Sequence, residues 1–388
     1  MRPPRRHITF VSGTRADLNL LLPTLAAIRA HPKLRLSVVA TGMHLSRLPA
    51  HGGRLAAFTA AGFAPDATVA WPEHRDVSHL SEITLTAGAR LAAMYRKLGT
   101  EGVVVLGDRV EAFAAAAAAH LSHLPLAHIH GGDRAEGQLD DALRHAISQL
   151  AHLHLAASAD SAERLLRLGQ DPRTVHIVGA PGVEGIVRLA APRAEVLGRF
   201  PHIGETAVVL LHPGSTDPKL ERKRAEVLLR ALRLAGIANA LLLPPNTDPG
   251  NQGIHAAWRE AAGKHAHFTS DIRTDLLKDL PRPFFLGLLA HCRLLAGNSS
   301  AGIIEASSFG TPVLDVGSRQ GGRVAPGNVA HAEFSLGSLA AGLRAIPGRS
   351  GRRRSDNPYA RANTARRIAG LLAGSWLSYP ASPKRLAH

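Results

Sequence analysis

The sequence is poor in several residue types, and each shortage excludes a class of protein. Its 388 residues include one cysteine, Cys292, which excludes a disulfide scaffold and an all-cysteine metal site and fits a reducing compartment. Aromatic residues make up 4% of the chain, so few rings are available to stack on single-stranded nucleic acid. No apolar run approaches the roughly 18 residues of a membrane span, and the first apolar stretch is too short for a signal peptide. We therefore expect a cytoplasmic protein without a membrane segment.

Acidic residues are scarce relative to basic ones. The chain has 30 Asp and Glu against 46 Lys and Arg, which gives a formal net charge of +16. Such an excess is compatible with binding to nucleic acid or to small anionic substrates. The basic residues are spread along the chain, and we interpret the densest run, residues 352–354, as a solvated loop. We therefore expect a small anionic substrate and no nucleic-acid partner.

Short apolar runs alternate with longer amphipathic stretches, which predicts an α/β fold with parallel sheets. Runs rich in Val, Ile, Leu and Ala predict two sets of strands: residues 8–11, 36–40, 103–106, 126–129, 152–156 and 175–178, then 207–211, 240–243, 267–269, 294–296 and 313–316. The helices expected between the first strands include residues 18–30, 110–120, 142–150 and 161–168.

The second set of strands repeats the pattern of the first, which indicates two doubly wound domains. We place their boundary near residue 190, where Pro192 and Pro201 flank the transition. The predicted domains are residues 1–190 and 191–360, and residues 361–388 are expected to form a helix that packs back on the first domain, followed by a loose tail. Two such domains facing each other would hold a ligand in the cleft between them.

Two motifs follow predicted strands of the first domain. Ser-Gly-Thr-Arg-Ala-Asp at residues 12–17 joins a strand to a helix, where Arg15 would add positive charge to an anion-binding helix terminus. A capped turn with a surface arginine explains the same residues. Gly-Asp-Arg at residues 107–109 follows another strand, so Asp108 would point into the cleft. Alternatively, Asp108 caps the next helix and Arg109 is its ion-pair partner.

Residues 128–145 form the motif that is densest in titratable groups. It runs from a predicted strand through His-Gly-Gly-Asp to a helix that opens with two aspartates. Asp141, Arg144 and His145 lie three and four residues apart, so they share a helix face. With Asp133, these carboxylates near a basic cleft could supply a general acid and a general base. Stabilisation of the helix N-terminus explains at least one of them equally well.

Two pairs of histidines raise the question of a metal site. His128 and His130 are two residues apart on a predicted strand, as are His152 and His154, so each pair would share a face. Imidazole together with carboxylate can bind zinc. His152 and His154 precede an apolar stretch and are also explained as hydrogen-bonded core residues. Because no compact ligand motif accompanies the pairs, we expect no metal.

Polar motifs also follow the strands of the second domain. His212 follows its first strand, and residues 244–251 form a polar turn that contains Asn246 and Asp248. Gly-Asn-Ser-Ser at residues 297–300 leads from a strand into a helix, so backbone amides and the hydroxyls of Ser299 and Ser300 would cradle a diphosphate. A capping box explains these serines but not the whole motif.

The residues beyond this motif extend the candidate site. Gly302 would allow a ligand to approach the backbone closely. Glu305, one turn into the helix, would accept hydrogen bonds from the two hydroxyls of a ribose. Arg319 and Arg323 follow the next strand and would bring two more cations to the same edge.

Taken in order, these motifs resemble those of the UDP-N-acetylglucosamine 2-epimerases, closest to the hydrolysing branch of sialic-acid-type pathways. The resemblance spans about residues 7–330 and rests on the motifs at residues 13–17, 107–109, 130–145, 212–213, 297–305 and 319–323. It implies a GT-B fold, in which two Rossmann-like domains face a central cleft. It also implies a UDP-sugar substrate, a homodimer, and neither a metal nor a nicotinamide cofactor.

The same resemblance implies a reaction and a role for each residue. Hydrolysing members eliminate UDP to form a 2-acetamidoglucal, and water then adds to give N-acetylmannosamine. By resemblance, the nucleotide is bound by Arg15, Asn246, Asp248, Ser299, Ser300 and Glu305. The residues around the sugar are Asp108, Asp133, Asp141 and His212, supported by Arg109, Arg144, His145, Gly302, Arg319 and Arg323. Carboxylates would move protons, while His212 and the arginines would stabilise the departing diphosphate.

The chain departs from the family pattern at three places. Asp133 stands where the family usually has Glu, and the shorter side chain withdraws the carboxylate, which affects rate unless another group compensates. Ala301 replaces a frequent third serine, and residues 213–219 differ from the commonest pattern. The substrate is therefore open between a UDP-linked N-acetylhexosamine and a 2,4-diacetamido relative.

Other functions remain open at this point. Non-hydrolysing epimerases usually carry a His-Arg string where this chain has His212-Pro213, and a His-Val-Glu-Ala-Gly string at residues 128–132, so both differences favour hydrolysis. A GT-B glycosyltransferase would turn over only with an acceptor. A sugar-nucleotide sensor would bind UDP without turnover, and a nucleic-acid binder would show steep salt dependence.

Overall fold

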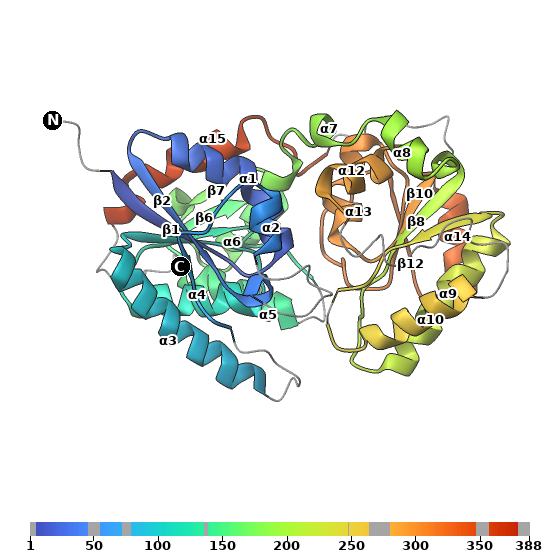
Figure 1. Cartoon of the computed structure of the whole chain (residues 1–388), viewed down its shortest axis with the longest axis horizontal. Helices are drawn as coiled ribbons and strands as arrows, with labels where there is room; N and C mark the ends of the chain where they lie inside the picture. Colours follow the sequence, from blue (N-terminus) through green and yellow to red (C-terminus); the bar gives the residue numbers. More distant parts are fainter. Residues whose placement is uncertain are drawn as a thin grey trace. The chain divides into compact units, whose positions relative to one another are not determined.

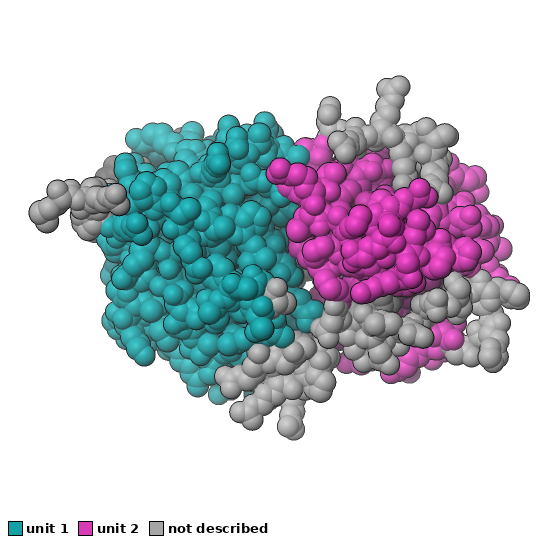
Figure 2. All heavy atoms as spheres, turned by 45° about the horizontal axis from the view of Figure 1, so that its top comes forward, with its two compact units in different colours: residues 1–133, 139–184, 359–388 teal, residues 134–138, 185–358 magenta. Residues whose placement is uncertain are grey.

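The structure is a computed structural model that describes residues 5–45, 55–71, 79–135, 139–246, 248–263, 280–346 and 357–378 (Figure 1). Its contacts divide the chain into two compact units, coloured teal and magenta in Figure 2. Unit 1 comprises Met1–Asp133, Leu139–Glu184 and Tyr359–His388, whereas unit 2 comprises Arg134–Gln138 and Gly185–Pro358. The sequence places the corresponding transitions near residues 190 and 360.

Unit 1 is built on a seven-stranded parallel sheet with the order β3-β2-β1-β4-β5-β6-β7. Its strands are β1 (Arg6–Ser12), β2 (Leu34–Ala40), β3 (Ala67–Thr68), β4 (Gly102–Leu106), β5 (Leu126–Ile129), β6 (Leu153–Ala156) and β7 (Val175–Ile177). The central strands are short, continuous apolar runs because both of their faces are covered. The strand order reverses between β1 and β4, which is the place where ligands bind in such sheets. Arg15 and Asp108 therefore follow the two strands that flank this switch point.

Helices pack on both faces of this sheet. They are α1 (Arg15–Ala30), α2 (Ala56–Ala60), α3 (Leu80–Leu98), α4 (Val110–Leu121), α5 (Leu139–Leu150), α6 (Ala159–Arg167) and α15 (Thr364–Leu372), with short 3-10 turns at Gly42–Leu45, Pro172–Thr174, Pro181–Val183 and Ser375–Ser378. Alternate residues of one strand enter opposite cores, as the two-residue period of a strand requires. Val104 of β4 joins the core formed with α1 and α15, whereas Val103 and Val105 join the core formed with α3 and α4.

The C-terminal helix α15 belongs to the core of unit 1. Ile368 and Leu372 are fully buried in the same cluster as Leu18 and Leu21 of α1. At the start of α15, the hydroxyl of Thr364 donates a hydrogen bond to the carbonyl of Val178 at 2.8 Å. This contact and the apolar face of α15 attach the end of the described chain to a sheet made by its first half.

Unit 2 has a five-stranded parallel sheet with the order β12-β11-β10-β8-β9. Its strands are β8 (Thr206–Leu210), β9 (Asn239–Leu242), β10 (Leu294–Gly297), β11 (Val313–Val316) and β12 (Val329–Ala332). Its helices are α7 (Ile186–Leu189), α8 (Arg193–Arg199), α9 (Pro218–Leu234), α10 (Asn251–Gly263), α12 (Arg282–His291), α13 (Ser300–Ile304) and α14 (Leu336–Ala345), with 3-10 turns at Ile203–Glu205 and Ala306–Phe309. The apolar faces of α9, α10 and α14 form one core with the sheet.

The expected α/β class and most of the expected strands are confirmed. Ten predicted strands match β1, β2, β4 to β11 within two residues at each end, and the eleventh, residues 267–269, lies outside the described residues. The sequence missed β3, β12 and the long helix α3. The helix expected within residues 361–388 corresponds to α15, which ends at Leu372 and is followed by a separate turn at Ser375–Ser378. The basic run at residues 352–354, expected to form a loop, and the tail at residues 379–388 also lie outside the described residues.

Among the residues that the structure describes, none of the helices combines the length and the hydropathy needed to cross a bilayer.

Candidate functional site

The turn between β1 and α1 is a capped helix start. The Thr14 hydroxyl accepts a hydrogen bond from the Asp17 amide at 3.2 Å, and Asp17 Oδ2 accepts from the amides of Gly13 and Thr14 at 3.1 and 3.0 Å. Burial raises the pKa of Asp17 to about 6, against the lowering effect of Arg109. Arg15 is half-buried at the first position of α1. The capped turn that the sequence offered as an alternative is therefore present, and anion binding by Arg15 stays a prediction.

Gly13 is required by the close approach of α4. A Cβ atom on Gly13 would lie 2.7 Å from Cβ of Glu111, much closer than van der Waals contact allows. Glu111 is buried, and its Oε2 accepts a hydrogen bond from Nε of Arg109 at 3.3 Å. The sequence analysis missed Glu111. Its signal is an acidic residue in the first turn of a helix that is rich in alanine.

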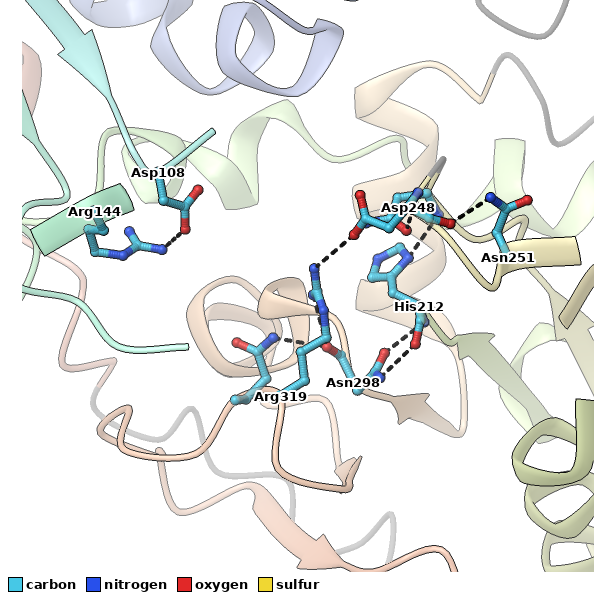
Figure 3. A network of polar contacts seen from close by, with 9 residues as sticks. Asp108, Arg144, His212, Asp248, Asn251, Asn298 and Arg319 are labelled. Carbon is cyan, nitrogen blue, oxygen red and sulfur yellow. Dashed lines mark hydrogen bonds and ion pairs between the residues drawn. The ribbon is translucent and has the colours of Figure 1, made fainter. Parts of the chain in front are cut away.

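Asp108 follows β4 and forms an ion pair with Arg144 of α5 (Figure 3). Arg144 Nη2 donates to Asp108 Oδ2, and Arg144 Nη1 donates to the main-chain carbonyl of His130 at 3.2 Å. The Arg144 side chain is 4% exposed and that of Asp108 is 19% exposed. The alternative in which Asp108 caps α4 is wrong, because the N-cap residue is Arg109 and it makes no side-chain cap.

Asp133 is turned into unit 1, and both of its carboxylate oxygens have partners there. Oδ2 lies 2.9 Å from Nδ1 of His130, and Oδ1 accepts a hydrogen bond from the hydroxyl of Ser161 at 2.7 Å. The Asp133 side chain is 2% exposed, whereas that of His130 is 11% exposed. The shorter side chain at this position therefore contacts a histidine instead of reaching solvent.

The helix face predicted for Asp141, Arg144 and His145 is divided in the structure. Arg144 reaches inward to Asp108 and His130. Asp141 and His145 are one turn apart and partly exposed, with 3.8 Å between Asp141 Oδ1 and His145 Nε2. Arg144 therefore contacts both Asp108 and His130, whereas the contact described for Asp141 and His145 is the one between them.

The paired histidines contact the protein itself. His128 is fully buried, with Nε2 2.7 Å from the carbonyl of Gly107 and Nδ1 3.1 Å from the hydroxyl of Ser148. His154, its register partner on β6, is also fully buried. His130 follows β5 instead of continuing it, so it does not share a strand face with His128. Over the described parts of the chain, no three His, Cys, Asp or Glu side chains are grouped to hold a metal ion.

In unit 2, His212 follows β8 and is held in a neutral form. Its Nδ1 accepts a hydrogen bond from the amide of Asn246 at 3.0 Å. Burial, assisted by the positive charge of Arg319, lowers the pKa of His212 to about 3. Because Nδ1 accepts, the single ring proton must lie on Nε2. His212 can therefore donate a hydrogen bond through Nε2 near neutral pH but does not act there as a cation.

Asn298 connects the loops that carry His212 and Arg319 (Figure 3). Its side-chain amide bonds to the amide and the carbonyl of His212 at 2.7 and 2.8 Å. Its own carbonyl accepts from Arg319 Nη1 at 3.4 Å and from Gln320 Nε2 at 2.9 Å. Arg319 Nη2 also lies 3.8 Å from Asp248 Oδ2, and Asp248 bonds to Asn246. The sequence analysis quoted Asn298 within its motif but assigned it no role.

The Gly-Asn-Ser-Ser motif has the predicted strand–turn–helix setting, although the helix α13 is short. Ser299 is the N-cap of α13, and its hydroxyl accepts from the Ala301 amide at 3.4 Å. Gly302 faces β11, because a Cβ atom there would lie 3.0 Å from Cγ1 of Val313. The small size of Gly302 therefore serves the packing of α13 on the sheet, and the close approach of a ligand to its backbone stays a prediction.

Glu305 already has a cationic partner. Its Oε1 accepts from Arg282 Nη2 at 2.6 Å, and the two side chains are 9% and 14% exposed, respectively. Arg282, the first residue of α12, was missed because nothing in its local sequence distinguishes it from a surface arginine.

Burial raises the pKa of Asp315, and Arg323, like Arg319, lowers it. Asp315 is also bonded to His331 at 2.8 Å.

The chain also matches a known family along most of its length. The family model described as UDP-N-acetylglucosamine 2-epimerase matches residues 26–373. The chain belongs to this family. It is 32% identical over 345 residues to the UDP-N,N'-diacetylbacillosamine 2-epimerase (hydrolyzing) of Legionella pneumophila, covering 87% of this chain and 88% of that protein. It is 30% identical over 336 residues to the UDP-N-acetylglucosamine 2-epimerase of Neisseria meningitidis, covering 86% of this chain and 85% of that protein.

Solved structures of this family share the architecture. The S. aureus MnaA–UDP co-structure matches with a TM-score of 0.77 at 18% sequence identity, over 99% of this chain and 100% of that one. The structure of UDP-GlcNAc 2-epimerase from Neisseria meningitidis bound to UDP-GlcNAc matches with a TM-score of 0.76, over 94% of this chain and 99% of that one. The likeness shows the GT-B fold, as the resemblance implied.

Within this epimerase fold, the predicted site residues fall into separate groups. In unit 1, Asp108, Asp133 and Arg144 all contact His130 or share a partner with it. In unit 2, contacts through Asn298 bring together the loops that carry His212, Asn246, Asp248 and Arg319. Glu305 pairs with Arg282, and Asp141 lies beside His145.

Proposed function

We propose that this epimerase is of the hydrolysing kind and converts a UDP-linked 2-acetamido sugar to UDP and the free 2-epimeric sugar. The observation that carries the proposal is the 32% identity, over 87% of the chain, to a relative named as a hydrolysing 2-epimerase. A second relative, from Campylobacter jejuni, has the same designation and is 27% identical. The motifs at residues 128–132 and 212–213 support the same branch.

The proposed reaction has two steps. In the first, a base removes the proton from C2 of the sugar, the C1–O bond breaks, and UDP leaves with the bonding electron pair as a C1=C2 double bond forms. In the second, water adds its hydroxyl to C1 and C2 regains a proton. The first step develops negative charge on the departing diphosphate. Preorganised donors and cations that stabilise this charge lower the barrier.

The residues of unit 2 supply suitable groups for the nucleotide. We assign the diphosphate to the Nε2–H of His212, to Arg319 and to the motif of Ser299 and Ser300, with Arg323 as a further cation. Glu305, Asn246 and Asp248 are assigned to the nucleoside. The neutral state of His212 supports this role, because a donor whose proton is fixed by Asn246 needs no change of protonation before the diphosphate leaves.

The residues assigned to the sugar are those of unit 1. We propose that Asp108 and Asp141 face the sugar and take part in proton transfer. The charge of Asp108 is balanced by Arg144. The chain has a single cysteine, Cys292, which is buried, and this scarcity of cysteine supports a cytoplasmic place for the enzyme. The homodimer implied by the family is a further proposal that sedimentation of the purified chain would test.

The sugar itself is tested by following the reaction in deuterated water by proton NMR. The substrates are UDP-N-acetylglucosamine and UDP-N,N'-diacetylbacillosamine in parallel tubes. Free UDP and a C2-deuterated free sugar are the expected products, and the faster tube identifies the substrate. A steady equilibrium between two UDP-sugars would instead place the chain in the non-hydrolysing branch. Turnover only after an acceptor is added would identify a glycosyltransferase.

A further inference from the structure

The environment of Asp133 argues against direct contact between its carboxylate and a substrate. Oδ1 accepts from Ser161 and Oδ2 is bonded to His130, at 2.7 and 2.9 Å. The side chain is 2% exposed. The neighbouring Gly132 holds this position tightly, because a Cβ atom there would collide with the carbonyl of Ser161. An outward rotation of Asp133 would therefore break two hydrogen bonds in a closely packed turn.

His130 is held in a conformation that few residues other than glycine adopt. Its φ is +63°, in the left-handed region, which is uncommon for a histidine. Such backbone strain persists only where surrounding contacts impose it, and it concentrates at functional sites. Here the contacts are the bond from its ring to Asp133 and the bond from Arg144 to its carbonyl. They keep an imidazole ring at the carboxyl end of β5, next to the switch point between β1 and β4.

The contact with Asp133 also fixes which ring nitrogen of His130 carries the proton. An ionised carboxylate can only accept, so in the neutral form of the ring Nδ1 donates to Asp133 and the lone pair lies on Nε2. This is the reverse of His212, whose Nδ1 accepts and whose Nε2 carries the proton. The two histidines are thus prepared for opposite tasks: His130 to take a proton and His212 to donate a hydrogen bond.

The other carboxylates of this cluster are less suited to act as the base. Asp108 is already paired with the guanidinium of Arg144, which stabilises its charged form and weakens its attraction for a proton. Asp141 has another titratable neighbour, because its Oδ1 lies 3.8 Å from Nε2 of His145. His130 shares the guanidinium of Arg144 with Asp108, since one nitrogen contacts its carbonyl and the other contacts the carboxylate. A ligand held near Asp108 is therefore also close to the main chain of His130.

We propose that His130 is a catalytic base of this enzyme and that Asp133 is the positioning residue that orients it. The inference rests on the proposed epimerase function and names the residue that moves the proton. Nε2 of His130 removes the proton from C2, the electron pair of the C2–H bond forms the C1=C2 double bond, and UDP departs with the pair of the C1–O bond. The imidazolium that results donates from Nδ1 to Asp133, whose negative charge balances it. The residue that departs from the family pattern thus acts through its neighbour.

Deletion of the ring tests this role without straining the backbone. His130→Gly removes the imidazole, suits the positive φ and leaves the main-chain carbonyl that contacts Arg144. We expect kcat for UDP release to fall by about 10²–10⁴-fold, the usual contribution of a general base, while the Kd for UDP stays unchanged. The matched control is His123→Gly, since His123 also has a positive φ of +55° in unit 1 but is exposed. This control should retain wild-type kcat.

Chemical rescue separates proton transfer from simple loss of packing. Imidazole added to His130→Gly should restore part of the turnover, whereas pyrazole, which has the same shape but is a far weaker base, should not. Equal rescue by both compounds would show that the ring only fills space and would overturn the role of His130 as a base. Wild-type kcat in His130→Gly would overturn it as well.

The positioning role of Asp133 is tested by a double-mutant cycle. Asp133→Asn should lower kcat in the wild-type background, with KM unchanged, but should have no further effect on kcat in His130→Gly. A loss by the same factor in both backgrounds would mean that Asp133 acts independently of His130. If the wild-type protein released no UDP from either sugar, the proposed function itself would be wrong and this role would fall with it. If the wild type were active and His130→Gly had the same kcat, the role of His130 would be refuted and the proposed function would stand.

Discussion

The side-chain amide of Asn298 bonds to both main-chain polar groups of His212, accepting from its amide at 2.7 Å and donating to its carbonyl at 2.8 Å. The residues lie at the ends of adjacent parallel strands, β10 and β8. A side-chain amide offers an acceptor and a donor on separate atoms, so it can bond to the amide and the carbonyl of one residue at the same time. Asn298 therefore continues the hydrogen-bond pattern of the sheet into the loop that carries the candidate site.

Asn298→Ala should weaken both stability and nucleotide binding. Asn298 is buried, and its loss leaves the amide and carbonyl of His212 without these partners, at a cost of about 1–3 kcal/mol in free energy of unfolding. The Kd for UDP should rise because the loop loses its fixed position. Urea unfolding and calorimetric titration with UDP measure the two effects. In the control Asn328→Ala, which removes a buried amide bonded to the carbonyl of Thr311, stability should fall with no change in the Kd. An unaltered Kd in Asn298→Ala would contradict the prediction.

The neutral state of His212 predicts a dependence of stability on pH. Burial lowers the pKa of His212 to about 3 in the folded protein, from an ordinary value of 6.5. Between these values the unfolded chain binds a proton that the folded protein does not, so stability falls as pH falls through this window. From pH 6.5 to 5, the wild type should lose at most about 2 kcal/mol relative to His212→Asn. Urea unfolding at several pH values gives this difference, and a constant difference would mean that His212 has the same pKa in the folded and unfolded states.

Two glycines predict opposite effects of the same substitution. Gly13→Ala places a methyl group 2.7 Å from Cβ of Glu111 and should destabilise the protein by about 1–3 kcal/mol through overpacking. Gly198→Ala meets nothing within 4 Å and lies inside the exposed part of α8. It should stabilise the protein by about 0.5–1 kcal/mol, because alanine has the higher helix propensity. Thermal unfolding of both variants tests the close contact between β1 and α4, which a stable Gly13→Ala would disprove.

The sequence predicted the strands of this protein well because buried parallel strands are short, continuous apolar runs. The weaker elements escaped it for physical reasons. β3 consists of Ala67–Thr68, too short to show a pattern, and β12 includes the polar His331 at the edge of its sheet. The helix α3 begins without a side-chain cap and was not marked by a start signal. Its stability comes from packing against α4, a tertiary contact that local sequence does not report.

The sequence predicted which residues belong to the candidate site but not which of them contact one another. The motifs placed Asp108, His212 and Asn298 correctly at the ends of strands, because topology alone brings those ends to one edge of each sheet. The sequence did not show that Arg144 pairs with Asp108, since the partners are 36 residues apart. Nor did it show that Asp133 turns toward His130, which depends on the left-handed conformation of that histidine. The packing of the folded chain determines which of several nearby groups each side chain contacts.

Glu305 and Arg282 should affect different properties although they form one ion pair. Glu305→Ala removes the proposed ribose acceptor and should raise the Kd for UDP about 10- to 100-fold, the equivalent of one or two charged hydrogen bonds. Arg282→Ala leaves Glu305 as a nearly buried charge without this partner and should destabilise the protein by about 3–5 kcal/mol. A control, Glu184→Ala, removes the carboxylate that accepts from the Ala365 amide and should lower stability without changing the Kd. An unchanged Kd in Glu305→Ala would remove Glu305 from the nucleotide site.

Asp108→Asn should separate turnover from nucleotide binding. The substitution keeps the size of the side chain but removes the charge that faces Arg144, so any proton transfer or charge balance supplied by Asp108 is lost. We expect kcat for UDP release to fall by about 10²–10⁴-fold, with the Kd for UDP unchanged. The matched control is Asp171→Asn, because Asp171 also pairs with an arginine, Arg173, but at the start of the turn Pro172–Thr174 between α6 and β7. Its kcat should equal that of the wild type. If Asp108→Asn kept wild-type kcat, Asp108 would have no part in the reaction, and its pair with Arg144 would serve only to hold α5 against β4.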